Sequence, residues 1–334
     1  MTSTQHERSG APWSGIAGDR GVVAVASDAE ALRVAADDAV GAGLVTRAAL
    51  HVANDPIGDG PGAVLRAVGD VAALLTSLAP AADLGLAATA SRHLRRHRRI
   101  WPTGDPTPGV GTVFFCHSRH DLEPAEFHRR WTTSHGPLAL RHHMGMWDYD
   151  QVSLLEVRGG PLLEGVEGIA VVQWPTGADL AHRFFDGPEG AAAIRADAES
   201  FTDLESTARY LMTETVLVDV DPPTAAGPCW LTDHRSVHFD TSPDDVWGLV
   251  GGIVTENVRD QRHDERMLEL EIIEGLPAAV VRYRCRYEVR TDGDGCRLDW
   301  QPTALVDLGG EAAFGALVDR EWTSVRDGLA AALA

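Results

Sequence analysis

The chain has 334 residues, 44% of them hydrophobic, and a formal net charge of −20. The length predicts two or three domains, and the composition is that of a globular protein. The strong negative charge argues against nucleic acid as a general partner. Arginine supplies every basic side chain other than histidine, which excludes a lysine Schiff base or a lysine nucleophile.

The remaining signals favour a cytoplasmic protein without a bound cofactor. No apolar run is long enough to span a bilayer, and residues 1–18 form a polar segment that predicts a disordered tail rather than a signal peptide. The four cysteines show no close paired spacing, so zinc and redox motifs are absent and a disulfide framework is not expected. Because no phosphate loop and no nucleophile elbow occur, we expect neither a metal nor a nucleotide.

The first segment, residues 19–107, predicts a βαββαβ unit. Its predicted elements are a strand at 21–26, a helix from 28 to about 42, strands at 44–53 and 62–67, a helix at about 70–78, and a strand that includes 93–101. Short apolar runs separated by helical stretches carry this prediction.

The second segment, residues 108–222, repeats that order with more residues. Its predicted elements are a strand at 112–117, a helix at 124–134, strands at 149–157 and 168–174, a helix beginning at 179–185, and a strand at 210–218. Residues 62–65 parallel 168–171, and 89–94 parallel 206–211. We therefore interpret the two segments as tandem ferredoxin-like units, with chance similarity in an alanine-rich sequence as the alternative.

The third segment, residues 228–334, follows a Pro- and Gly-rich linker at 221–228. Ser242 predicts a helix start, because it can cap a turn that opens with proline and two acids. Residues 267–272 and 279–290 alternate as strands, and a turn at 292–295 leads into a return strand. A final helix is predicted by apolar residues at helical spacing, namely Phe314, Leu317, Val318, Trp322, Val325 and Leu329. We expect a curved antiparallel sheet wrapped on this helix.

One helix end in the second segment carries the strongest functional signal. Phe127 and Trp131 are four residues apart and share a helix face. The following Gly136-Pro137 pair predicts that the helix stops, which places His135 at its C-terminal end. Imidazole exchanges a proton near neutral pH, so His135 is the main candidate for a general acid or base. A structural histidine bonded to the helix end is the alternative.

Residues from about 111 to 219 resemble the EthD family of dimeric α/β-barrel proteins. The resemblance is carried by Phe127, Trp131, His135-Gly136-Pro137-Leu138, Tyr149-Asp150-Gln151, Phe184-Phe185, Asp197, Phe201-Thr202-Asp203 and Glu214. Members of this family pair two ferredoxin-like units so that their sheets close a barrel. The resemblance implies an α+β fold in which the first segment supplies the second unit of an intramolecular barrel. Since the first segment lacks the His135-Gly136-Pro137 motif, we expect it to complete the barrel without supplying chemistry.

The third segment resembles the START/SRPBCC superfamily, which includes polyketide aromatase/cyclases. Residues 236–247, 280–289 and 296–300 and the final helix carry this resemblance. Too little chain is present for the usual early strands, so we expect a reduced helix-grip domain with a smaller or open cavity.

Further candidate residues lie on strands of the second segment. Phe115, His117 and Arg119 share one strand face, and His117 enters the barrel cavity if that face lines it. Asp148 and Tyr149 are placed to orient a histidine or to donate to a substrate carbonyl, although a Tyr149 hydroxyl at the surface is slightly favoured. Glu214 has two possible roles. It could polarise a histidine across the barrel, or it could be a carboxylate at the barrel rim.

We assign catalysis to His135, His117, Tyr149 and Glu214, and substrate binding to Phe115, Trp131, Asp148 and Arg119. His142 and His143 are interpreted as solvated loop residues rather than metal ligands, because no third ligand is evident. The basic residues 92–99 are interpreted as a solvated edge strand, with docking of an anionic substrate or an acidic carrier protein as the alternative. Tyr283, Cys285, Tyr287 and Trp300 are interpreted as core rather than an aromatic pocket.

The leading functional hypothesis is a cofactor-independent enzyme of specialised metabolism, a cyclase/aromatase or isomerase acting on an aromatic or polyketide-like intermediate. His135 moves a proton in this hypothesis. The alternatives are a non-catalytic small-molecule binding or accessory protein, and a haem- or oxygen-dependent oxidoreductase of the same barrel type. We expect a small-molecule partner, no nucleic acid, no membrane, and a monomer or homodimer.

Overall fold

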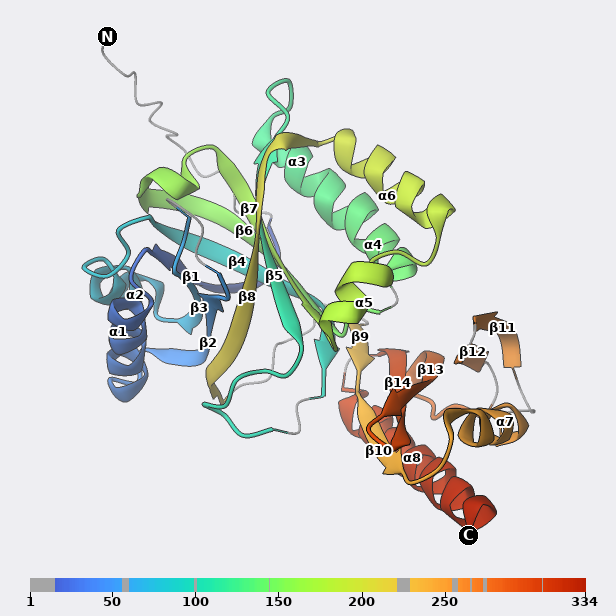
Figure 1. Cartoon of the computed structure of the whole chain (residues 1–334). Helices are drawn as coiled ribbons and strands as arrows, with labels where there is room; N and C mark the ends of the chain where they lie inside the picture. Colours follow the sequence, from blue (N-terminus) through green and yellow to red (C-terminus); the bar gives the residue numbers. More distant parts are fainter. Residues whose placement is uncertain are drawn as a thin grey trace.

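The computed structural model describes residues 16–55, 60–98, 101–143, 145–220, 229–253, 258–264, 266–272, 275–307 and 309–334. Most of the predicted N-terminal tail and the predicted linker at 221–228 lie outside these residues. Figure 1 shows a barrel formed by the first two segments (blue to yellow) and a second sheet with a long helix formed by the third (orange to red).

The first unit follows the predicted βαββαβ order. Its elements are β1 (Asp19–Ala26), α1 (Ala29–Gly41), β2 (Val45–Ala53), β3 (Ala63–Gly69), α2 (Val71–Leu78) and β4 (Gly85–His97). Both helices begin at an aspartate whose carboxylate accepts backbone N–H bonds of the first turn, Asp28 for α1 and Asp70 for α2.

The second unit has the same order, with its helical regions divided. Its elements are β5 (Val110–Ser118), α3 (Pro124–Arg130), η1 (Trp131–His135), α4 (Gly136–His142), β6 (Asp148–Gly159), η2 (Pro161–Leu163), β7 (Val166–Trp174), α5 (Gly177–His182), α6 (Pro188–Glu199) and β8 (Thr202–Asp219). The closing strand starts well before the predicted residue 210.

The eight strands of the two units close a barrel, as predicted. Their order is β1-β3-β2-β8-β5-β7-β6-β4, and β4 pairs back to β1, with every neighbouring pair antiparallel. The pairs β2–β8 and β4–β6 join the two units. The barrel is therefore intramolecular, which removes the free sheet edges that a single unit would expose.

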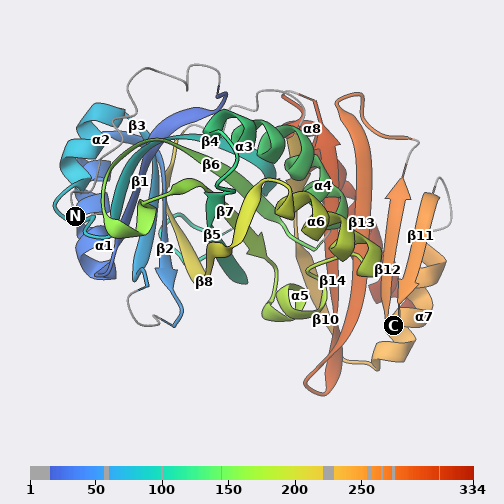
Figure 2. The ribbon, with the colours of Figure 1, turned by 90° about the horizontal axis from the view of Figure 1, so that it is seen from above.

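The barrel has one apolar core inside and one under each set of helices. Inward side chains such as Val23, Val113 and Ile169 fill the interior. The outer face of the first unit packs against α1 and α2 through small residues, including Ala24, Ala36, Ala39, Ala48 and Ala67. Figure 2 shows α3, α4 and α6 over the second unit, on the side of the barrel that meets the third segment.

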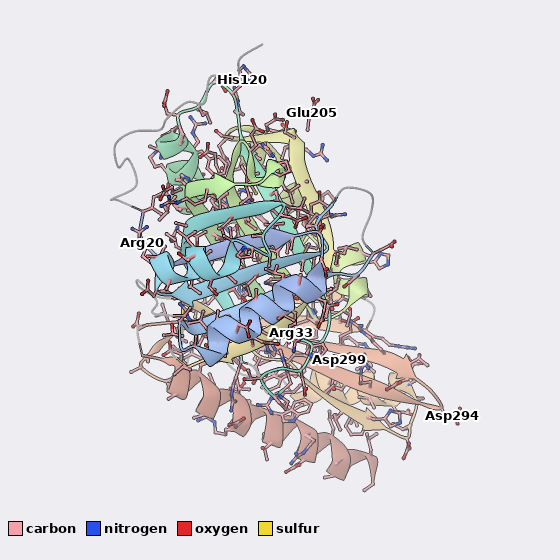
Figure 3. The ribbon with its side chains drawn as sticks, turned by 90° about the vertical axis from the view of Figure 1, so that its left-hand side faces the viewer. Arg20, Arg33, His120, Glu205, Asp294 and Asp299 are labelled. Carbon is pink, nitrogen blue, oxygen red and sulfur yellow. The ribbon has the colours of Figure 1, made fainter. Side chains whose placement is uncertain are left out.

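The third segment continues the barrel sheet. Its elements are β9 (Cys229–Thr232), β10 (Arg235–Phe239), α7 (Pro243–Ile253), β11 (Val258–Asp264), β12 (Met267–Ile272), β13 (Val280–Asp292), β14 (Gly295–Val306) and α8 (Glu311–Leu333). β9 pairs in parallel with the end of β4 and antiparallel with β14, so it links the two sheets. Asp294 marks the predicted hairpin turn, which projects from the molecule in Figure 3.

The C-terminal helix buries all six apolar residues that predicted it. They share one core with Tyr283, Cys285, Tyr287 and Trp300, and Trp322 stacks on Trp300 with ring centroids 5.6 Å apart. Interpreting these four residues as core was therefore correct.

For residues 92–98, the interpretation as a solvated edge strand was wrong, and residue 99 lies outside the described residues. β4 is paired with β1, β6 and β9, and a bulge between His93 and Arg95 breaks the expected alternation. The Arg95 guanidinium is fully buried, where it donates to the carbonyl oxygens of Leu140, His143 and Met146 and lies over the Trp230 ring. Arg98 pairs with Asp319 of α8.

Candidate active site

A cavity of about 500 Å³ lies between the outer face of the barrel and the helices of the second unit. β5, β6 and β7 form its floor, and η1, α4 and α6 form its roof. Its aromatic lining includes Phe114, Trp131, Trp174, Phe184, Phe185 and Phe201. Small side chains at Ala139, Ala170 and Ala198 leave the space open. This is the composition expected of a small-molecule site that takes flat apolar ligands.

The helix above this cavity does not end at Gly136-Pro137, so that prediction was wrong. The chain runs from α3 through a π-helical turn, η1, into α4. Proline lacks an N–H and would clash with the preceding turn of a regular helix. The wider π turn, in which the Gly136 N–H donates to Trp131 O, accommodates it. The Gln151 side chain of β6 donates to the same carbonyl at 3.0 Å and braces the turn from below.

The π turn brings His135 to the cavity wall, where Asp197 of α6 holds its ring. His135 Nδ1 lies 2.9 Å from Asp197 Oδ2, and Ser134 Oγ donates to Asp197 Oδ1 at 2.8 Å. The hydrogen bond from His135 lowers the pKa of Asp197, against the smaller effect of its partial burial, so the carboxylate is ionised at neutral pH. An ionised acceptor fixes the proton on Nδ1 and leaves Nε2 as the basic atom.

Tyr149 contributes a hydroxyl to the same cavity. The prediction that the Tyr149 hydroxyl lies at the surface was wrong. The side chain is buried, and its oxygen accepts a hydrogen bond from Gln151 Nε2 at 3.1 Å. Burial raises the pKa of Tyr149 above its ordinary value, so the group stays protonated. With its oxygen already an acceptor, its O–H is the part left to donate to a ligand.

His142 and His143 are not solvated loop residues. His142 closes α4 and its Nδ1 lies 3.0 Å from the Asp186 carboxylate. His143 is buried in the cavity wall, and its Nδ1 hydrogen bonds to Phe184 O. Burial lowers the pKa of His143 to about 4, so this ring is neutral at pH 7. Its hydrogen bond ties the end of α4 to the Phe184-Phe185 wall.

Gly168 of β7 makes the position of Trp131 possible. A Cβ at this position would lie 2.3 Å from Cζ3 and 2.6 Å from Cη2 of the Trp131 ring. We therefore expect Gly168→Ala to lower the free energy of unfolding by about 1–3 kcal/mol, because the indole must move in a packed wall. Urea denaturation measures the change. Gly159→Ala is the matched control, because its Cβ would meet nothing within 4 Å, and a similar loss in both variants would contradict the prediction.

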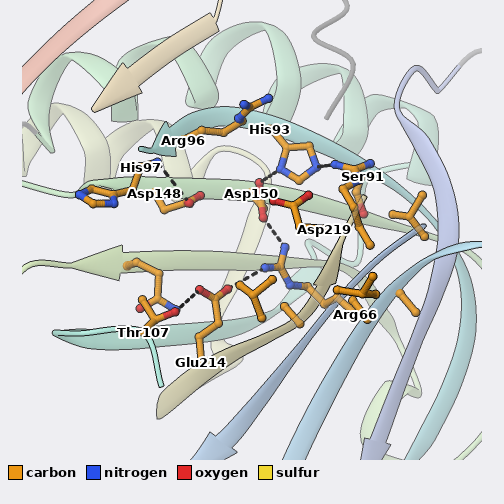
Figure 4. A pocket seen from close by; sticks show the side chains of 18 of the residues that line it. Arg66, Ser91, His93, Arg96, His97, Thr107, Asp148, Asp150, Glu214 and Asp219 are labelled. Atoms are coloured by element: carbon orange, nitrogen blue, oxygen red, sulfur yellow. Dashed lines mark hydrogen bonds and ion pairs between the residues drawn. The ribbon is translucent and has the colours of Figure 1, made fainter. Parts of the chain in front are cut away.

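A second, polar cavity of about 380 Å³ lies inside one end of the barrel. Figure 4 shows Arg66 of the first unit between Asp150 and Glu214 of the second. Arg66 donates to Asp150, to Glu214 at 3.2 Å and to His51 at 3.0 Å, and Thr107 donates to Glu214 at 2.9 Å. This buried ion network joins the two units.

The carboxyl groups of this network respond differently to burial. Burial opposes ionisation of Asp150, but His93 and Arg66 outweigh it and lower its pKa. Burial raises the pKa of Glu214 despite Arg66. Burial also raises the pKa of Asp148, and the neighbouring Asp150 and Glu214 charges add to the effect.

The structure divides the predicted site residues among four places. His135, Tyr149 and Trp131 line the apolar cavity. Asp148 and Glu214 line the barrel cavity, and Phe115 packs in the barrel core. His117 and Arg119 line neither cavity, because a bulge after Cys116 ends the alternation and Arg119 pairs with Asp121 at the surface. The His135 and Glu214 groups therefore lie on opposite faces of the barrel wall.

Two residues of the site were not given a role from the sequence. Asp197 was noted only as part of the family resemblance, and Gln151 only as part of the Tyr149-Asp150-Gln151 stretch. Nothing in the spacing links residue 197 to residue 135, because α6 is brought over η1 only by the tertiary fold. The resemblance was the one signal that pointed to both.

Residues 119–205 match the family model of the EthD domain. The matched residues include His135, Asp197, Tyr149 and Trp131. No curated protein matches the chain. In the described ranges, every helix is too short or too polar to cross a membrane.

Solved structures give low-scoring similarities. An anthrone oxidase-like protein is 15% identical with a TM-score of 0.40, covering 62% of this chain and 95% of its own. A mutant chlorite dismutase from Candidatus Nitrospira defluvii is 11% identical with a TM-score of 0.37, covering 61% and 93%. The di-domain ARO/CYC protein BexL is 10% identical with a TM-score of 0.23, covering 93% and 95%. All three scores lie below 0.5, so no function is transferred from them.

Proposed function

We propose that this protein is a cofactor-independent enzyme that moves a proton on an aromatic or polyketide-like molecule, as a cyclase or isomerase. The observation that carries the proposal is the His135–Asp197 pair in the wall of an aromatic cavity. A base oriented by a carboxylate beside an apolar cavity is the arrangement that proton abstraction next to a carbonyl needs.

In this proposal His135 Nε2 removes a proton from the carbon next to a substrate carbonyl. The electron pair of that C–H bond forms an enolate, whose oxygen accepts a hydrogen bond from the Tyr149 hydroxyl. For ring closure, the enolate carbon bonds to a second carbonyl carbon of the same molecule, and the imidazolium returns its proton to the new alkoxide. For isomerisation, the proton returns to a different carbon. Neither route needs an oxidant.

The third segment has a structural role in this proposal, as a reduced helix-grip domain. Its residues Tyr283, Tyr287, Trp300 and Trp322 pack into its own core. Its Arg286 donates to Asp179 of α5 at 2.8 Å, and its Gln301 donates to Gly145 O at 3.3 Å. These contacts hold α5 and the residues around Gly145 in place, next to the cavity wall.

The proposal is tested by exchange of the α-protons of 2-tetralone in D2O, followed by proton NMR. We expect the protein to accelerate the exchange above the buffer rate at equal pH. Tight binding of the ketone without acceleration would overturn the proposal and favour a binding protein. A Soret band in the purified protein would also overturn it and favour a haem oxidoreductase.

Asp197→Asn is expected to slow this exchange at least tenfold and up to about 10⁴-fold, because an amide N–H favours the tautomer with the proton on Nε2. Nitrogen-15 NMR of the His135 ring checks the cause. The wild type should carry its proton on Nδ1 and the variant on Nε2. Ser134→Ala, which removes only the second bond to Asp197, should keep the wild-type tautomer. A rate loss without a tautomer change would contradict the role given to Asp197.

A further inference from the structure

The apolar cavity carries one permanent formal charge in its lining, on Arg195 of α6. Apart from two imidazoles, the other lining residues are apolar or neutral, and none is acidic. Arg195 and Leu204 are both exposed, so they mark the side on which the cavity opens to solvent.

The Arg195 guanidinium has no acidic partner among the described residues. Two arginines near the cavity do have one, since Arg130 lies 2.6 Å from Glu126 and Arg183 lies 2.7 Å from Glu288. Asp197 and Glu199 follow Arg195 on the same helix, but among the described residues neither forms an ion pair with it. An apolar cavity with one cation at its opening selects ligands by charge as well as by shape.

We infer that the ligand of this cavity has an aromatic body and one anionic group, such as a carboxylate, which Arg195 binds at the opening. The rings then lie along the Trp131 and Phe201 wall, and the anion lies at Arg195, two residues before Asp197 on α6. A guanidinium suits this task, because it stays charged and binds a carboxylate with two parallel hydrogen bonds. The inference rests on the proposed function only in placing the ligand beside His135.

Two fluorescent probes that share one ring system test the inference. 8-Anilinonaphthalene-1-sulfonate carries an anion, and N-phenyl-1-naphthylamine is its neutral counterpart. We expect Arg195→Gln to weaken binding of the sulfonate about three- to tenfold and to leave the neutral probe within twofold. Arg195→Glu should weaken the sulfonate further, and added salt should reduce the difference between wild type and variant.

Two controls make the result specific. Arg141→Gln removes an exposed arginine of the neighbouring helix α4 that does not line the cavity, and it should change neither affinity. Ala198→Phe fills the cavity and should weaken both probes. Equal effects of Arg195→Gln and Arg141→Gln, or sulfonate binding that survives Ala198→Phe, would overturn the inference. Because the readout is binding, its failure is distinct from a failure of His135 to exchange protons.

Discussion

Replacing His135 with asparagine is expected to slow the α-proton exchange of 2-tetralone by about 10²–10⁴-fold, the usual contribution of a positioned base. The reason is geometric as well as chemical. Asp197 fixes the ring so that Nε2 is the basic atom, and the apolar lining keeps the ligand beside it. Asparagine keeps a polar side chain of similar reach at a half-buried position, so the fold should persist.

Binding separates this effect from a damaged cavity. The affinity for N-phenyl-1-naphthylamine should stay within about twofold, because the substitution leaves the aromatic side chains of the lining unchanged. His143→Asn provides a matched histidine change in the same cavity wall, and its neutral ring has no proton-transfer role in the proposal. Equal loss of exchange in both variants, or full activity in His135→Asn, would end the assignment of the base.

Replacing Arg66 with methionine is expected to lower the free energy of unfolding at pH 7 by about 3–5 kcal/mol. The substitution leaves Asp150 and Glu214 buried without the guanidinium that binds both. Urea denaturation of the whole chain measures the loss. Arg33→Met removes an exposed helical pair with Asp37 and should cost no more than about 0.5 kcal/mol.

The loss of unfolding free energy in Arg66→Met should depend on pH in a defined direction. Without the guanidinium, burial raises the pKa of Glu214 further above its unfolded value, whereas His93 still opposes the effect of burial on Asp150. The folded variant then binds more protons than its unfolded state, so its stability falls as pH rises from about 4. The difference from wild type should therefore shrink as pH is lowered toward 4. A pH-independent difference would mean that lost packing, rather than uncompensated charge, causes the effect.

The alternation of apolar and polar residues predicted many of the strands. It could not show which side of each strand faces the barrel interior. Asp148 and Tyr149 were both proposed for one site, yet neighbouring strand residues point to opposite faces. In the barrel, Asp148 lines the interior and Tyr149 the space under the helices. Which face is the interior depends on how the eight strands close, and that is a tertiary property.

Predictions from local sequence patterns failed where an extra residue interrupts a regular helix or strand, as in a π turn or a β-bulge. Gly136-Pro137 predicts a helix stop, and the π turn overrides it. The bulge at Arg95 moves this side chain to the face that alternation assigned to its neighbours. His135 could be singled out as a candidate from its local motif, whereas its partner Asp197 lies on a helix brought close only by the fold.

The covalent joining of two units into one barrel changes what a single substitution can do. In a symmetric homodimer each change occurs twice, once in each copy of the site. Here α1 contains no histidine and packs through alanines, while η1 carries His135 above an open cavity. The described residues thus contain one His135–Asp197 pair and one aromatic cavity beside it, and titration with a cavity ligand should saturate at one equivalent per polypeptide. Either half can also be redesigned without imposing the same alteration on its counterpart.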